Sequence, residues 1–161
     1  MGSLNKKENY KKIAKNVIDL EIKALKKLRS SINSSFDEAV SAVVRCQSKV
    51  ILCGVGKSGL IAAKISATLS SVGTPSFSLS ANDCSHGDLG SISKKDVLIL
   101  ISYSGESEEL KNIIKYANRN KIILIGIVSK KIQLYTKHLI LNCLFQKLKK
   151  LVLALCPPQA L

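Results

Sequence analysis

The spacing of apolar residues divides the chain near residue 49. Upstream of it, apolar positions recur at helical spacing and predict one helix over residues 5–30 and a second over 36–46. Ser35 is the expected N-cap of the second helix, which has acidic residues in its first turn. The first helix has an apolar stripe on one side and lysine-rich faces on the other. This pattern favours a packing or oligomerisation role for residues 1–34 over a membrane-surface helix. The stripe consists of Ile13, Val17, Leu20, Ile22, Leu25 and Leu28.

Downstream of residue 49, short apolar runs alternate with helical patterns. This alternation predicts an α/β fold, a parallel sheet with helices on both faces. The expected strands are 49–56, 75–79, 96–104 and 121–129, and the expected helices are 58–73 and 106–120. Ligands bind beyond the carboxyl ends of the strands in such sheets. The polar loops 54–59, 80–90 and 102–109 all follow strand ends, so the sequence predicts a site there.

The charge of the chain is unevenly distributed. The chain has 161 residues, enough for one domain, and a net charge of +14, which suggests a nucleic-acid partner. However, all 11 acidic residues lie at or before Glu109, and the basic residues after it do not alternate with aromatic ones. We therefore expect no nucleic-acid partner, and the loss of acidic residues needs another explanation.

Targeting signals and cysteine usage limit the location of the protein. No apolar run is long enough for a transmembrane helix, and the polar N-terminus lacks a signal-peptide core. The five cysteines contain no CxxC pair, which argues for a reducing compartment and for buried or incidental thiols. We expect a cytoplasmic protein with no membrane partner, no metal and no cofactor.

The segment GVGKSG, residues 54–59, fits more than one nucleotide-binding pattern. A P-loop is excluded because Ile51 occupies the position of its first glycine. A dinucleotide-binding turn matches Gly54, Gly56 and Gly59, with Asp83 at about the right distance downstream, but this pattern alone is weak. Lys57 and a serine inside the turn suit a compact phosphate better than a pyrophosphate.

A second polar turn, SYSGES at residues 102–107, supports a phosphate ligand. Ser102, Ser104 and Ser107 surround Gly105 where a strand ends and a helix begins. Hydroxyl groups and backbone N–H groups at a helix N-terminus can hold one phosphate. An ordinary helix cap needs only one serine, so we favour the phosphate interpretation.

Four segments of the chain, in their order and spacing, resemble the sugar isomerase (SIS) domain of arabinose-5-phosphate isomerases. They are VGKSG, the TPSF strand, SHGDLG and ISYSGESEEL. The resemblance covers roughly residues 10–131 and implies a flavodoxin-like strand order. It also implies an aldose–ketose isomerase that interconverts D-arabinose 5-phosphate and D-ribulose 5-phosphate through an enediol. That reaction serves Kdo biosynthesis for capsule or lipopolysaccharide, and the family is cytoplasmic and oligomeric. We accordingly expect a pentose 5-phosphate as ligand and a homo-oligomer.

The resemblance also assigns the site residues. Lys57, Glu109 and His86 are the implied catalytic residues, although Glu109 is also explained as a first-turn helix acid and His86 as a loop hydrogen-bonder. Isomerisation requires a base, a proton shuttle and a cation near the developing oxyanion. The implied substrate and phosphate ligands are Gly56, Ser58, Ser102, Ser104, Gly105 and Ser107.

The family pattern stops after Lys131. Read in a displaced frame, Lys149–Leu153 can encode the family segment EACP, and Cys156–Leu161 can encode PTTST. The codons of Lys130, Lys131 and Ile132 contain a run of adenines at which one added base restores the family frame. We therefore interpret residues 132–161 as an out-of-frame tail and residues 35–131 as a partial SIS domain without CBS domains.

This interpretation has consequences for fold and activity. The sheet is expected to lack its last strand and helix, unless tail runs such as LILNCLF cover the exposed edge of the fourth strand. The truncated chain is expected to have low activity or none. A non-catalytic sugar-phosphate-binding module is the main alternative function, and a dinucleotide-binding domain is a weaker one.

Overall fold

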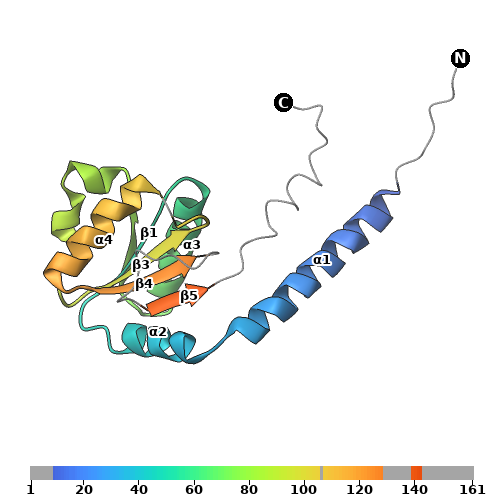
Figure 1. Cartoon of the computed structure of the whole chain (residues 1–161), viewed down its shortest axis with the longest axis horizontal. Coiled ribbons are helices and arrows are strands. Elements are labelled where there is room, and N and C mark those ends of the chain that lie inside the picture. Colours follow the sequence, from blue (N-terminus) through green and yellow to red (C-terminus); the bar gives the residue numbers. More distant parts are fainter. Residues whose placement is uncertain (1–8, 106, 129–138, 143–161) are drawn as a thin grey trace, which may run out of the picture.

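A parallel sheet of five strands with helices on both faces forms the centre of the fold (Figure 1). The computed structural model describes residues 9–105, 107–128 and 139–142. The order across the sheet is β2-β1-β3-β4-β5, the flavodoxin-like order that the resemblance implied. The strands are β1 (Val50–Gly54), β2 (Ser76–Ser80), β3 (Val97–Ser102), β4 (Ile123–Val128) and β5 (Leu139–Asn142).

The helices lie where the sequence predicts them, with small shifts at their ends. The α-helices are α1 (Tyr10–Ser31), α2 (Ser34–Val44), α3 (Lys57–Ser71) and α4 (Glu108–Asn120), and the 3₁₀ helices are η1 (Asp83–His86) and η2 (Asp88–Ser91). The predicted N-cap of α2 is wrong, because Asn33 and not Ser35 occupies that position. The Asn33 carboxamide oxygen accepts a hydrogen bond from the Ser35 backbone N–H at 3.0 Å, so Ser35 lies inside the first turn.

Alternate residues of the central strands enter two separate hydrophobic cores. In β1, Ile51 and Cys53 face the core that α4 and η1 cover, whereas Val50 and Leu52 face the core that α2 and α3 cover. Every residue of β1 and β3 is buried. Burial on both faces explains why these strands appear in the sequence as continuous apolar runs.

Helix α1 contributes no residue to either of these hydrophobic cores. It extends away from the sheet (Figure 1), and none of its residues is buried. Its N-terminus is capped by Asn9, whose side chain accepts a hydrogen bond from the Lys12 backbone N–H at 3.1 Å. No helix in the described part of the chain is long and apolar enough to cross a membrane. The packing or oligomerisation role of α1 stays a prediction.

A strand from the tail lies at the edge of the sheet beside β4. Strand β5 pairs in parallel with β4, from Ile125 opposite Leu139 to Val128 opposite Asn142. The expected loss of the family's last strand does not leave the edge of β4 open, because the LILN part of the tail run LILNCLF covers it, as the sequence allowed. Apart from β5, the predicted out-of-frame tail lies outside the described residues.

Candidate functional site

The carboxyl ends of the neighbouring strands meet at one edge of the sheet. Gly54 at the end of β1 lies opposite Ser80 of β2 and Ile101 of β3, and Ser102 of β3 lies opposite Val128 of β4. The loops that carry the predicted site residues all leave the sheet from this edge. The parallel arrangement therefore brings the three polar loops of the sequence together, as the sequence predicted.

Close backbone contact shapes the turn between β1 and α3. A Cβ atom added to Gly54 would lie 2.7 Å from the carbonyl carbon of Ser58, and one added to Gly59 would lie 2.9 Å from the carbonyl oxygen of Gly54. Gly56 has a φ of +55° and caps α3, so the helix begins at Lys57. The glycines thus let the helix N-terminus sit directly on the strand end, and they leave Lys57 exposed and Ser58 half-buried at that edge.

The turn between β3 and α4 lies at the same edge of the sheet. The buried Ser102 hydroxyl accepts a hydrogen bond from the Gly105 backbone N–H at 2.9 Å, and Gly105 has a φ of +72°. The side chain of Ser107, the N-cap of α4, makes no capping hydrogen bond to the helix. Ser104 is half-buried between these two serines. Ser102 thus holds the turn in place, in addition to its predicted role as a ligand.

The two acidic residues in the first turn of α4 have different surroundings. Glu108 is exposed and pairs with Lys111 on the same helix, whereas Glu109 is half-buried. Of the two, only Glu109 was predicted to be catalytic. Its position at the start of α4 and that of Lys57 at the start of α3 place them at the carboxyl ends of adjacent strands.

The loop after β2 contains the predicted residue His86. The residue ends η1, and Gly87 follows it with a φ of +116°. The side chain of His86 lies outside the part that the structure describes. Asp83, the acidic residue of the dinucleotide alternative, is exposed at the start of η1.

Two buried thiols lie at this edge. Cys84 of η1 and Cys53 of β1 both belong to the core under α4. The neighbouring Cys84 side chain and burial raise the pKa of the Cys53 thiol, and the neighbouring Cys53 side chain lowers the pKa of the Cys84 thiol. The only sequence signal was the position of both cysteines beside the glycine turn and in the SHGDLG loop. No group of three or more potential metal ligands exists among the described residues.

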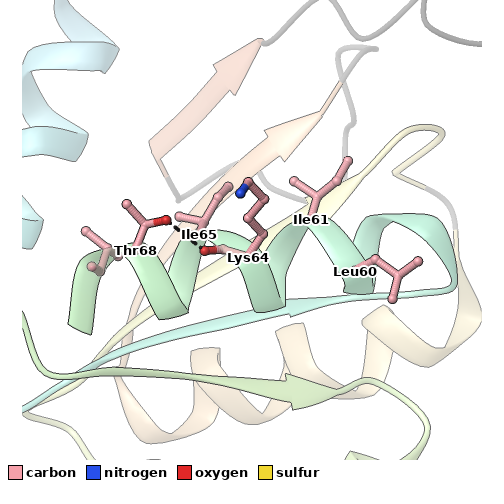
Figure 2. Close-up of a pocket in the computed structure, with 6 residues that line it drawn as sticks. Leu60, Ile61, Lys64, Ile65 and Thr68 are labelled. Atoms are coloured by element: carbon pink, nitrogen blue, oxygen red, sulfur yellow. Dashed lines mark hydrogen bonds between the residues drawn. The ribbon is translucent and has the colours of Figure 1, made fainter. Parts of the chain in front are cut away.

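Two other features lie away from this edge. An apolar groove runs along α3 (Figure 2), where the Thr68 hydroxyl donates to the Lys64 carbonyl at 3.0 Å. The groove contains none of the predicted site residues and is lined by Leu60, Ile61, Lys64, Ile65, Thr68 and Leu69.

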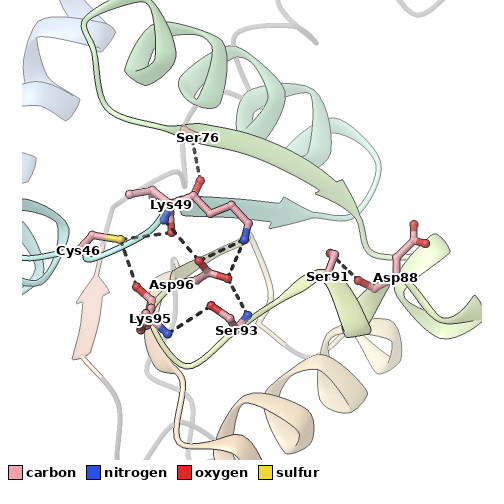
Figure 3. Close-up of polar contacts among 9 residues, drawn as sticks. Cys46, Lys49, Ser76, Asp88, Ser91, Ser93, Lys95 and Asp96 are labelled. Carbon is pink, nitrogen blue, oxygen red and sulfur yellow. Dashed lines mark hydrogen bonds and ion pairs between the residues drawn. The ribbon is translucent and has the colours of Figure 1, made fainter.

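The buried carboxylate of Asp96 lies at the opposite, amino-terminal edge of the sheet (Figure 3). It accepts hydrogen bonds from the Ser93 backbone N–H at 2.6 Å and from the Lys49 ammonium group at 3.1 Å. Burial alone would raise the pKa of Asp96, but the hydrogen bonds from Ser93, Ser48 and Lys49 outweigh it and lower the pKa. Since Lys49 precedes β1 and Asp96 precedes β3, the network joins two strand starts and has a structural role.

Comparisons with known proteins agree with this arrangement. The chain is 42% identical over 121 residues to "Arabinose 5-phosphate isomerase KdsD" of Yersinia pestis, covering 75% of the chain and 37% of that protein. It is 40% identical over 111 residues to "Arabinose 5-phosphate isomerase GutQ" of Escherichia coli K12, covering 69% of the chain and 35% of the relative. The chain therefore spans less than half the length of these curated relatives.

A solved structure and a family profile match the same region. The structure of c3406 from E. coli CFT073 in complex with arabinose 5-phosphate superposes with a TM-score of 0.71 at 36% identity, covering 78% of this chain and 67% of the other. The profile of the SIS domain matches residues 44–138, more than half of the chain. The chain belongs to the SIS domain family.

Proposed function

We propose that the carboxyl edge of the sheet binds a pentose 5-phosphate, as part of an isomerase that interconverts D-arabinose 5-phosphate and D-ribulose 5-phosphate. The observation that carries the proposal is the pair of helix N-termini at adjacent strand ends, α3 after Gly56 and α4 after Ser107. Helix N-termini and glycine-rich turns favour phosphate anions. The relatives named arabinose 5-phosphate isomerase supply the choice of sugar.

The residues at this edge suit the chemistry of aldose–ketose exchange. A base removes the proton on the carbon beside the carbonyl, and the resulting enediol takes a proton back on the neighbouring carbon. In our proposal Glu109 moves protons, Lys57 stabilises the charge that develops on oxygen, and His86 binds sugar hydroxyls or assists ring opening. The phosphate-binding residues in this proposal are Gly56 and Gly105 in the two turns and the hydroxyl-bearing Ser58, Ser102, Ser104 and Ser107.

Calorimetric titration of the chain with D-arabinose 5-phosphate tests the binding site. Loss of a hydrogen bond to a charged group costs about 1.5–3 kcal/mol, so Lys57→Ala should weaken binding about 10- to 150-fold. Lys64→Ala is the matched control, because Lys64 is also exposed on α3 but lines the apolar groove away from the predicted site. The affinity of this variant for the sugar phosphate should be unchanged. Equal affinities of the two variants, or tighter binding of NAD than of the sugar phosphate, would refute the proposed site.

We also propose that residues 132–161 are translated out of frame and that this chain is a low-activity or inactive form. Sequencing of the DNA across the codons of Lys130 to Ile132 should show a run of adenines at which one added base restores the family pattern. A sequence that no single added base can restore would contradict the proposal. Turnover only in the restored version supports an isomerase, whereas sugar-phosphate binding without turnover in both versions supports a non-catalytic binding module.

A further inference from the structure

Helix α1 carries an apolar stripe, yet none of its residues is buried (Figure 1). Within the stripe, Leu20, Ile22 and Leu25 are 48%, 44% and 61% exposed. Ile32 and Asn33, which join α1 to α2, both have an extended backbone, so α1 continues away from the sheet and does not turn back onto it. A contiguous exposed apolar face of this kind marks a binding surface.

The stripe contains one acidic residue at its centre. Glu21 lies four residues after Val17 and four residues before Leu25, so the three side chains share one face of α1. No ion pair within the described part of the chain involves Glu21. A carboxylate in the middle of an apolar contact needs a cation opposite it, because an unpaired buried charge is costly. The surface that fits this stripe is therefore apolar and has one basic residue at its centre.

The apolar groove along α3 has this complementary pattern. Lys64 lies four residues after Leu60 and four before Thr68, and Figure 2 shows its side chain on the same side of α3 as that of Ile65. Among the described residues that line the groove, Lys64 is the only charged one, and no ion pair in the described ranges involves it. The groove extends for about 14 Å along α3, and the stripe from Val17 to Leu25 for about 12 Å along α1.

We propose that α1 of a second copy of this chain lies in the apolar groove along α3, with Glu21 of one copy paired with Lys64 of the other. The same contact occurs twice in the dimer, because each copy offers one α1 and one groove. Contact of α1 with α1 is a poorer arrangement, since it places Glu21 against apolar side chains or against a second Glu21. Docking of α1 on its own chain requires a turn at Asn33, whose side chain caps α2 through the Ser35 N–H.

Sedimentation equilibrium of the whole chain tests the dimer, and charge reversal tests the ion pair. Glu21→Lys and Lys64→Glu should each raise the dissociation constant of the dimer at least about tenfold, because like charges then face each other. The double variant restores opposite charges and should recover the wild-type dissociation constant. Asp19→Lys is the matched control, because the exposed Asp19 lies two residues from Glu21 and so on a different face of α1. This variant should dimerise like the wild type.

A carbodiimide, which joins a carboxylate directly to an amine, locates the contact. In an equal mixture of heavy-nitrogen-labelled and unlabelled chains, it should join the tryptic peptide 16–23 of one chain to the peptide 58–94 of the other, uncleaved at Lys64. Joined peptides that always carry the same label would show that α1 docks on its own chain, and would overturn the proposal.

Three further results would overturn it. These are a wild-type chain that stays monomeric, a double variant that dimerises as weakly as the single ones, and a monomer that sediments with phosphatidylglycerol vesicles, which would identify α1 as a membrane-surface helix. Neither the sedimentation nor the cross-linking measurement depends on a sugar phosphate. The dimer and the proposed function can therefore fail separately.

Discussion

Substitution of Gly54 by alanine would test whether backbone contact positions the turn between β1 and α3. The added Cβ would lie 2.7 Å from the carbonyl carbon and 2.8 Å from the carbonyl oxygen of Ser58, which is about 0.7 Å short of ordinary contact at 3.4 Å. These neighbours are backbone atoms, so a rotamer change cannot relieve the overlap. Either the strand end and the first turn of α3 move apart, or the overlap remains as strain.

Overpacking of this kind costs about 1–3 kcal/mol. With a urea m-value of about 2 kcal/mol/M, the midpoint of unfolding should fall by about 0.5–1.5 M. Circular dichroism at increasing urea concentrations measures this midpoint, and an unchanged m-value would show that the change lies in stability. Binding of D-arabinose 5-phosphate should weaken in parallel, because α3 carries Lys57.

Gly90 provides the matched control. A Cβ at Gly90 would have no neighbour within 4 Å, and this glycine does not have a positive φ. Gly90→Ala should therefore change the free energy of unfolding by no more than about 0.5–1 kcal/mol. Gly59→Ala disturbs the same contact from the helix side, because its Cβ would lie 2.9 Å from the Gly54 carbonyl oxygen. The loss of stability in the double variant should therefore be smaller than the sum of the losses in the two single variants. Equal urea midpoints for Gly54→Ala and Gly90→Ala would refute the reasoning.

Two further substitutions probe stability away from the site. Asp96→Asn should flatten the loss of stability in acid. The folded-state pKa of Asp96 is lowered, so its stabilisation is complete above its ordinary pKa of 3.8 and is lost as the pH falls through the lower folded value. Urea unfolding from pH 6 to pH 2 measures this slope, and equal slopes for wild type and variant would contradict the assignment. Leu110→Ala should lower the free energy of unfolding by about 2–5 kcal/mol, because the fully buried side chain leaves a cavity under α4. Leu60→Ala, at a position 74% exposed, should cost less than about 1 kcal/mol, and a similar loss in both variants would show that α4 is not part of a tight core.

The sequence allows prediction of the features that depend on local pattern. The apolar runs that became β1 and β3 are continuous because both faces of these strands are buried, so their type and order were predictable. The glycine turn was also predictable from local sequence, through the spacing of Gly54, Gly56 and Gly59, and the structure gives Gly56 a positive φ there. The predicted roles of Lys57, Glu109 and the serines at the strand ends stay predictions.

Two kinds of feature were not predictable from the sequence. One depends on which of two suitable residues takes a position, and the other depends on contact between distant segments. Asn33 and Ser35 are both good N-caps, and only the folded helix shows that the Asn33 side chain accepts the Ser35 N–H. The burial of Cys53 and Cys84 in one core requires β2 to lie beside β1, so no spacing rule reveals it. The position of β5 is also a tertiary result, because β5 pairs in parallel with β4 and does not form a hairpin with it.

The pairing of β5 with β4 depends on the main chain and not on the identity of the side chains. A strand at a sheet edge is held through its main chain, and the main chain is the same in every reading frame. If the tail is out of frame, a short apolar run of foreign sequence still pairs with β4 from Ile125 to Val128. A single base would then change every side chain after Lys131, while the main-chain pairing at this edge does not require the original side chains.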